Sequence, residues 1–133
     1  MSFLLHQDTC AAAVRQVPLV NHRWRQHRGC LHVSAITVTG LELWLTHGRR
    51  TPSRYLQTYA AFMQGILVPP VDEAVAHRAA GIGTRLRIQG QPLNTVDQQI
   101  AATAFVHGLT VVTHAPQAYA NIPGLTVVDW MVP

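Results

Sequence analysis

The most constraining feature of the sequence is a short run at 109–113, which reads Leu-Thr-Val-Val-Thr and follows Gly108. Such a run, apolar on both faces and rich in β-branched residues, is typical of a central strand in a parallel sheet that is covered on both sides. The N-terminal segment 3–5 predicts a second buried strand, and the segments 30–34, 66–68 and 125–128 predict three more.

Segments with helical spacing separate these runs. We expect helices at 11–17, from Thr37 or Thr39 to about Gly48, at 53–65, 72–90 and 95–107, and a short helical turn at 117–121, with a loop at 49–53. The expected N-caps are polar side chains that can accept a backbone hydrogen bond, namely Asp8 or Thr9, Ser53, Asp72, and Asn94 or Thr95. Strands that alternate with helices predict an α/β fold in which helices flank a central, mostly parallel sheet.

Length and composition favour one domain that spans residues 1–133. Hydrophobic residues make up 48% and charged residues 12% of the 133, which is enough apolar surface for one core and excludes a disordered chain. The apolar stretch near the N-terminus is too short for a signal peptide or a membrane span, so we expect a cytoplasmic protein that does not enter a membrane.

The formal net charge is +4, and all ten basic residues are arginine. A basic balance favours an anionic partner such as RNA, although a solvated surface explains it equally well. The segment 22–28 is the densest basic stretch, and there Arg23, Arg25 and Arg28 could follow an RNA backbone while Trp24 stacks on a base. The alternative is a surface helix or loop whose Trp24 packs inward.

The predicted strands bring polar residues to one place. In a parallel sheet, ligands bind beyond the carboxyl ends of the strands. His6 and Asp8 follow the first strand, Thr113 and His114 follow the central strand, and Asp97 begins the last long helix. We therefore expect these side chains to line one cleft.

The C-terminal third resembles a VapC-type PIN domain, a family of toxin ribonucleases. The matching segments are Asp97-Gln98-Gln99-Ile100-Ala101-Ala102-Thr103-Ala104, then 107–113, then Ile122-Pro123-Gly124-Leu125 with Asp129-Trp130. The segments 3–10 and 34–38 also fit, and the resemblance is weakest at 17–32 and 49–65. It implies a PIN-like three-layer sandwich in which acidic residues from four places bind Mg²⁺ or Mn²⁺, hard cations that prefer carboxylate oxygens and activate water.

Several of these acidic positions are substituted in an ungapped alignment. His6 then takes the place of the first catalytic Asp, Gly40 that of the Glu, and Ala115 that of the fourth residue, while Asp97 is retained. We prefer this alignment because Thr9 and Cys10 match as well.

A second alignment shifts the two early motifs by two residues, so that Asp8 and Glu42 join Asp97 as catalytic residues. It needs two insertions, and two residues turn a helical side chain by about 200°, away from the cleft. In this alignment Asp8 and Glu42 are metal ligands. The alternative is that Asp8 is an N-cap and Glu42 a solvated charge on a helix surface.

The resemblance leaves two functions open. In the first, the chain is a catalytically impaired relative that keeps the fold, self-association as a homodimer, and binding of RNA or a small antitoxin-like protein, with or without a metal. In the second, it is an active Mg²⁺- or Mn²⁺-dependent endoribonuclease toxin that uses Asp8, Glu42 and Asp97, with Asp97 and Asp8 as metal ligands. A further hypothesis places Zn²⁺ between His6, His114 and Asp97, because imidazoles suit that ion; the alternative is that the two histidines only fill space.

Overall fold

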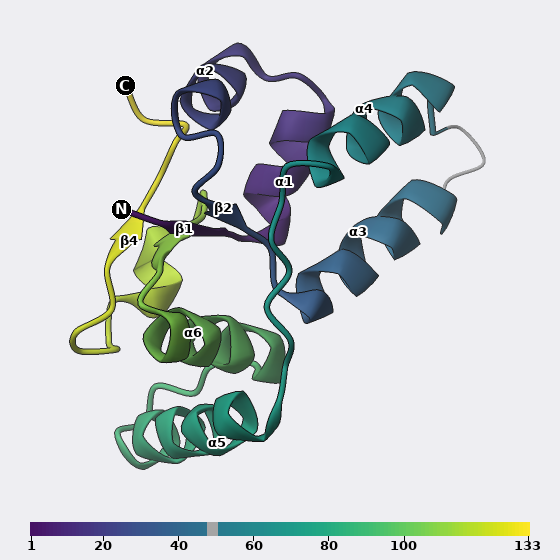
Figure 1. Cartoon of the computed structure of the whole chain (residues 1–133). Coiled ribbons are helices and arrows are strands. Elements are labelled where there is room, and N and C mark those ends of the chain that lie inside the picture. The colour runs from purple at the N-terminus through teal and green to yellow at the C-terminus, as the bar shows by residue number, and fades with distance from the viewer. Residues whose placement is uncertain (48–50) are drawn as a thin grey trace.

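A computed structural model describes residues 1–47 and 51–133. Its centre is a parallel sheet with the strand order β2-β1-β3-β4 (Figure 1). The strands are β1 (Phe3–Leu5), β2 (Leu31–His32), β3 (Thr110–Val112) and β4 (Val127–Val128). β1 lies beside β3 in the register Leu4↔Val111. This confirms the predictions of a buried strand at 3–5 and a buried central strand at 109–113.

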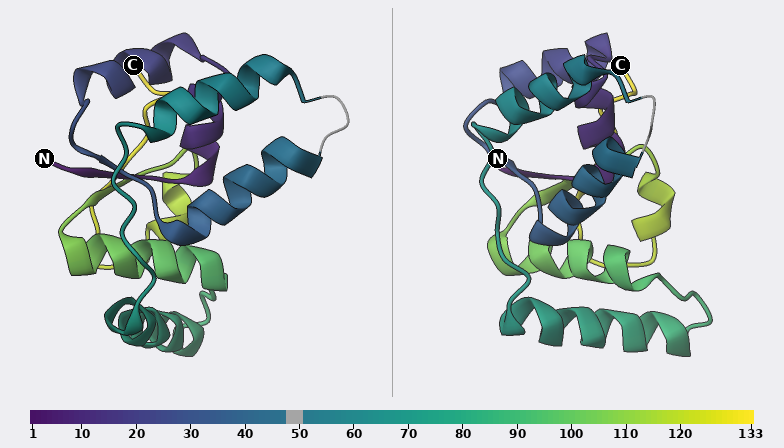
Figure 2. Two further views of the ribbon diagram at one scale, coloured as in Figure 1. Left: turned by 45° about the vertical axis from the view of Figure 1, so that its right-hand side comes forward. Right: turned by 90° about the vertical axis from the view of Figure 1, so that its right-hand side faces the viewer.

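In the residues that the structure describes, six α-helices and one 3₁₀ turn connect the strands. They are α1 (Gln7–Val14), α2 (Pro18–Gln26), α3 (Ala35–His47), α4 (Ser53–Met63), α5 (Glu73–Ile88), α6 (Thr95–His107) and η1 (Pro116–Tyr119). Helices α1 to α4 lie on one side of the sheet, and α6, covered by α5, lies on the other (Figure 2). The α/β fold with flanking helices is therefore confirmed.

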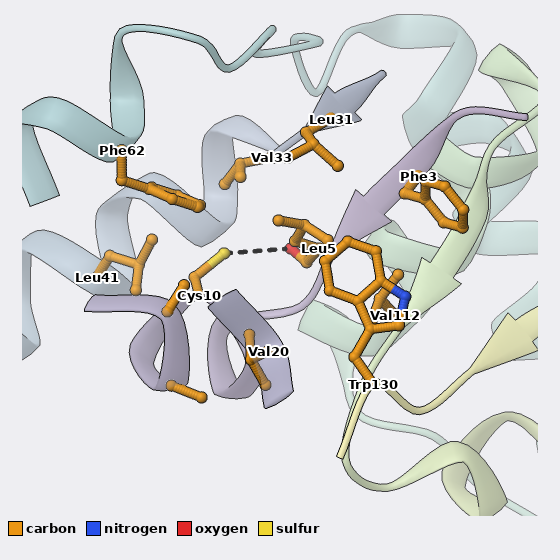
Figure 3. Close-up of a cluster of buried hydrophobic side chains, with 12 residues drawn as sticks. Phe3, Leu5, Cys10, Val20, Leu31, Val33, Leu41, Phe62, Val112 and Trp130 are labelled. Atoms are coloured by element: carbon orange, nitrogen blue, oxygen red, sulfur yellow. Dashed lines mark hydrogen bonds between the residues drawn. The ribbon is translucent and has the colours of Figure 1, made fainter. Parts of the chain in front are cut away.

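Alternation along β1 explains the three layers. Phe3 and Leu5 point into a core shared with α1 to α4, whereas Leu4 points into a second core under α5 and α6. Successive side chains of a strand face opposite sides, so a three-residue apolar strand can supply both cores. In the first core, Cys10 Sγ lies 3.7 Å from the Leu5 carbonyl oxygen among aliphatic and aromatic side chains (Figure 3).

One predicted strand is wrong. The segment 66–68 makes only an isolated parallel bridge, between His32 and Leu67. Pro69 and Pro70 follow directly, and proline has no N–H to continue a ladder. The strands predicted at 30–34 and 125–128 are present but shorter, as β2 and β4.

The helix boundaries agree in part. Asp72 and Asn94 cap α5 and α6 as predicted, each accepting a backbone N–H from the first turn. The predicted cap of α1 is wrong, since the helix begins at Gln7 and the side chain of His6 accepts the N–H of Asp8. α3 begins earlier than expected, and Ser53 is the first residue of α4 rather than its cap.

The expected end of α3 at Gly48, and Arg49 and Arg50 of the predicted loop, lie outside the described residues. The apolar stripe of α4 belongs mainly to the first core: Phe62 is buried and Tyr59 and Met63 pack beside it, while Leu56 is 47% exposed. Within the described ranges, none of the helices has the length and apolarity needed to cross a membrane.

Candidate functional site

The carboxyl ends of the central strands bring together the polar residues that the sequence predicted. His6 follows β1, and Thr113 follows β3, so both lie at the same edge of the parallel sheet. Asp8 lies in the first turn of α1 and Asp97 in the first turn of α6. The geometry of this edge is that of one polar centre with two carboxylates.

His6 lies between the two carboxylates and contacts both. Its Nε2 is 3.1 Å from Asp97 Oδ1, and its Nδ1 is 3.2 Å from Asp8 Oδ1. The side chain is 24% exposed, so both contacts are only partly screened by solvent. One imidazole thus bridges two acids that are 89 positions apart in the sequence, from 8 to 97.

Burial alone would lower the pKa of His6, but hydrogen bonds and charge attraction from Asp8 and Asp97 outweigh burial and raise that pKa to about 9. The imidazolium is therefore the favoured form at neutral pH. In that form Nδ1 carries a proton and donates to the Asp8 carboxylate, so it cannot also accept the Asp8 backbone N–H. Protonation of His6 exchanges a helix cap for an ion pair.

Asp8 is held by donors from the segment that follows β3. Its Oδ2 accepts the Thr113 hydroxyl at 2.8 Å and the His114 backbone N–H at 3.0 Å. Burial works against ionisation of this carboxyl, yet the hydrogen bond and charge of His6, with these two donors, hold its pKa well below the usual range. Asp8 is thus an ionised carboxylate whose oxygens already have partners.

Asp97 is satisfied in the same way. Its Oδ1 accepts the Tyr119 hydroxyl at 2.8 Å, and its Oδ2 accepts the Asn94 side-chain N–H at 2.8 Å. The hydrogen bond from His6, first, and those from Tyr119 and Asn94 lower the pKa of Asp97 despite burial. Burial and the Asp97 charge raise the pKa of Tyr119, which keeps its hydroxyl proton available for donation. Sequence reasoning missed Tyr119, although an aromatic residue in the turn after the central strand was the available signal.

Gly40 and Gln7 occupy complementary space. A Cβ placed on Gly40 would collide with Oε1 of Gln7, and the Gln7 Nε2 lies 3.4 Å from the Gly40 carbonyl oxygen. The Gln7 side chain therefore fills the place where a side chain at position 40 would begin. This packing fits the ungapped alignment, in which Gly40 stands at the position of the family's Glu.

Glu42 does not join the centre. It is exposed on α3, where its Oε2 accepts the Tyr59 hydroxyl at 3.0 Å. Burial, and then the contact with Glu42, raises the pKa of Tyr59 to about 12. The second alignment would need Glu42 as a ligand at the centre, but Glu42 instead contacts Tyr59. This agrees with the helical geometry of α3, in which two residues turn a side chain away from the cleft.

The residues present do not fit a divalent cation. Among residues 1–47 and 51–133, no three His, Cys, Asp or Glu side chains are arranged to hold one metal ion. An ion needs carboxylate oxygens directed at one point, at about 2.0–2.6 Å. Here the imidazole of His6 stands between the two carboxylates, and their oxygens accept hydrogen bonds from protein donors.

His114 lies beside a different acid from the one expected. Its Nδ1 is 3.4 Å from Asp129 Oδ1, and neither ring nitrogen has a hydrogen-bond partner within the described part of the chain. The predicted Zn²⁺ set of His6, His114 and Asp97 is therefore not assembled. Ala115 donates its backbone N–H to the Thr113 hydroxyl oxygen and has no side chain that could bind an ion.

The predicted RNA-binding segment forms α2 and the turn after it. The ring centroids of Trp24 and Phe62 are 5.7 Å apart. The Arg28 guanidinium lies over the Trp24 ring, 5.3 Å from the centroid of that ring. Trp24 therefore packs inward, which is the alternative that the sequence left open. Arg23 donates to the Val132 carbonyl oxygen at 3.1 Å, whereas Arg25 is exposed.

Comparison with known proteins gives consistent matches. The family model described as "PIN domain" matches residues 10–121. A Shigella flexneri protein named tRNA(fMet)-specific endonuclease VapC is 28% identical over 131 residues, which cover 98% of each chain.

Solved structures give the same result. The chain superposes on one in the crystal structure of DNA-bound VapBC from Salmonella typhimurium with a TM-score of 0.86, 27% identity and 98% coverage of both chains. A chain of FitAcB from Neisseria gonorrhoeae matches with a TM-score of 0.77 and 25% identity, covering 98% of this chain and 99% of that one. With the parallel sheet and the acidic edge described above, these matches show that the chain belongs to the PIN-domain family and is of the VapC type.

Proposed function

We propose that this chain is a catalytically impaired VapC-type protein, which keeps the fold and the protein contacts of the toxin ribonucleases without their metal-dependent cleavage. The observation that carries the proposal is the position of His6, whose ring bridges Asp8 and Asp97 where an ion would need free carboxylate oxygens. Gln7 adds support, because it fills the space beside Gly40.

The competing function is an active Mg²⁺- or Mn²⁺-dependent endoribonuclease. Its support is the similarity to proteins named tRNA(fMet)-specific endonuclease, together with two ionised carboxylates at the expected edge of the sheet. Such an enzyme would have to displace His6 and recruit further oxygens on binding the ion.

An RNA cleavage assay separates the two functions. Purified protein is incubated with structured RNA and Mg²⁺ or Mn²⁺, beside an Asp97→Ala control. We expect the two proteins to be equally inactive. Cleavage by the natural sequence that disappears in Asp97→Ala would contradict impairment and establish the active enzyme.

A restored variant tests the physical cause. His6→Asp, Gln7→Thr, Gly40→Glu and Ala115→Asp together return carboxylates to the family positions and remove the Gln7 side chain from the space beside position 40. We expect this variant to bind Mn²⁺ in calorimetry and the natural sequence not to bind it. Equal binding by the two would show that His6 does not exclude the ion.

We further propose that the chain binds a small antitoxin-like protein and associates with itself. The structural relatives include VapBC from Salmonella typhimurium and a toxin–antitoxin complex from Klebsiella pneumoniae. The chain exposes Leu43 on α3 and Leu56 on α4, which are 52% and 47% accessible. Sedimentation equilibrium of the natural sequence and of Leu43→Ser/Leu56→Ser tests self-association. A monomer at all concentrations would contradict it.

Contact with RNA through α2 and the turn after it would rest on Arg23, Arg25 and Arg28, because the Trp24 ring already packs against Phe62. Triple replacement by alanine should weaken RNA binding and reduce its salt dependence. Unchanged affinity at low salt would contradict a role for this segment.

A further inference from the structure

A pocket on the far side of the sheet takes no part in the centre. It has a volume of about 270 Å³ and lies between α5, Phe105 on α6 and the turn at 121–123. α5 forms the outermost layer there (Figure 1). Phe105 is eight residues beyond Asp97 on α6, which corresponds to about 12 Å along the helix.

Gly81 creates the opening of this pocket. Arg78 and Arg85 line it from positions three residues before and four residues after Gly81, so all three share one face of α5. A Cβ on Gly81 would meet no atom within 4 Å, so the pocket is open at Gly81 between the two arginines, and we call this opening the notch. Both side chains are exposed and long enough to reach one ligand in that notch.

The notch has an apolar floor and one amide. Ile82, Phe105 and Ile122 form the floor, and Asn121 stands at its side. The Arg78 guanidinium lies 4.7 Å from the Phe105 ring centroid, which orients that cation over the floor. None of the described residues that line the pocket is acidic, and His77, which lines it, pairs with the Glu73 carboxylate.

We propose that this notch binds one nucleotide, with its phosphate on Arg85, its base stacked on the Arg78 guanidinium that covers Phe105, and the base edge toward the Asn121 amide. An arginine fork suits phosphate, and a guanidinium plane beside a single amide suits a nucleobase. The volume of the pocket lies just below the range of roughly 300–1,000 Å³ that is typical of sites for drug-sized ligands, which is enough for one nucleotide. The site does not depend on whether the centre around His6 cuts RNA.

Binding can be measured by NMR titration of the full chain with each nucleoside 5′-monophosphate, with adenosine and with inorganic phosphate. We expect saturable shifts at α5 and 121–123 for the monophosphates, with weaker binding of adenosine and phosphate alone. Arg85→Gln should weaken binding by about tenfold or more, the effect of one charge-assisted hydrogen bond. Arg87→Gln, which removes the same charge from a residue outside the pocket, should leave affinity unchanged.

Gly81→Leu blocks the notch without removing a charge. The substitution favours the helix, since glycine in a helix interior is unfavourable, so the variant should fold and lose nucleotide binding. Retained binding in Gly81→Leu would overturn the proposal, and so would equal losses in Arg85→Gln and Arg87→Gln, or phosphate binding as tightly as a monophosphate.

A second titration distinguishes the source of the nucleotide. A short single-stranded RNA that is displaced by monophosphate, and that also fails to shift α5 in Gly81→Leu, would show that the pocket holds a unit of RNA. Binding of the monophosphate without competition from RNA would assign the pocket to a free nucleotide. Failure of all these probes to give saturable shifts would overturn the site while leaving the cleavage assay unaffected.

Discussion

At the scale of single residues, His6 takes the role that a bound cation would otherwise take. It places one delocalised positive charge between Asp8 and Asp97 and so relieves the repulsion between two carboxylates held at the same edge. A metal ion in the same place would need further oxygen ligands besides the two carboxylates. The histidine relieves the repulsion with its two ring nitrogens, which makes the stability of the fold depend on pH.

Stability should therefore fall as pH rises from 6.5 to 9. The pKa of His6 is raised from 6.5 to about 9 in the folded chain, so its contribution is complete below 6.5 and is lost as pH passes through 9. We expect a loss of about 2–3 kcal/mol across this interval, measured by urea unfolding. Below pH 4, protonation of Asp8 and Asp97, whose pKa values are lowered, should also destabilise the fold.

His6→Gln should flatten the slope between pH 6.5 and 9. His77→Gln is the matched control, because His77 also pairs with a carboxylate but is exposed on α5. An unchanged slope in His6→Gln would show that the ion pairs of His6 do not stabilise the fold.

Gly40 and Gly81 offer a second residue-scale comparison. Both lie within helices, where replacing Gly by Ala gains about 0.5–1 kcal/mol in free energy of unfolding. Gly81→Ala meets open space and should show this gain, whereas Gly40→Ala must displace Gln7 and should show less or none. In a Gln7→Ala background the two should become equal. A persistent difference there would mean that another contact limits position 40.

At the scale of the elements, α6 begins at the centre, so its cap has two roles. The Asn94 side chain accepts the Asp97 backbone N–H at 2.8 Å and also donates to the Asp97 carboxylate. Asp72 caps α5 through one acceptor and contacts no part of the centre in the described structure. The cap of α6 is thus linked to the centre, whereas the cap of α5 is not.

We expect Asn94→Ala and Asp72→Ala each to cost about 1 kcal/mol, the usual value of a lost N-cap. Asn94→Ala should in addition lower the NMR-measured pKa of His6, because Asp97 then loses the side chain that holds it in place. Asp72→Ala should leave that pKa unchanged. If the pKa of His6 were the same in both variants, the cap of α6 would have no influence on the centre.

At the scale of the whole molecule, the first core encloses a free thiol. Cys10 is fully buried in the core between β1 and helices α1 to α4, and burial raises the pKa of its thiol, whereas Cys30 is half-buried. A thiol reagent should modify Cys30 first and Cys10 only through global unfolding, at a rate that urea increases in step with the unfolding transition. Modification of Cys10 at the rate of Cys30, followed by mass spectrometry, would contradict this packing.

Much of this architecture could be predicted from the sequence, because Leu109–Thr113 and Phe3–Leu5 are apolar enough to form only buried strands. The sequence places His6 and Thr113 at the cleft because they follow those strands, and Asp97 because it lies at the start of the last long helix. The bridging role of His6 could not be predicted, since it depends on side-chain direction across segments 91 residues apart. Tyr119 and the exchange of space between Gln7 and Gly40 were missed for the same reason.

That exchange also limits how such a chain could change over time. With Gln7 in place, a long side chain at position 40 meets an occupied volume, and with glycine at 40, a smaller residue at 7 would leave a void beside α3. We therefore expect related sequences to differ at positions 7 and 40 together more often than at either position alone.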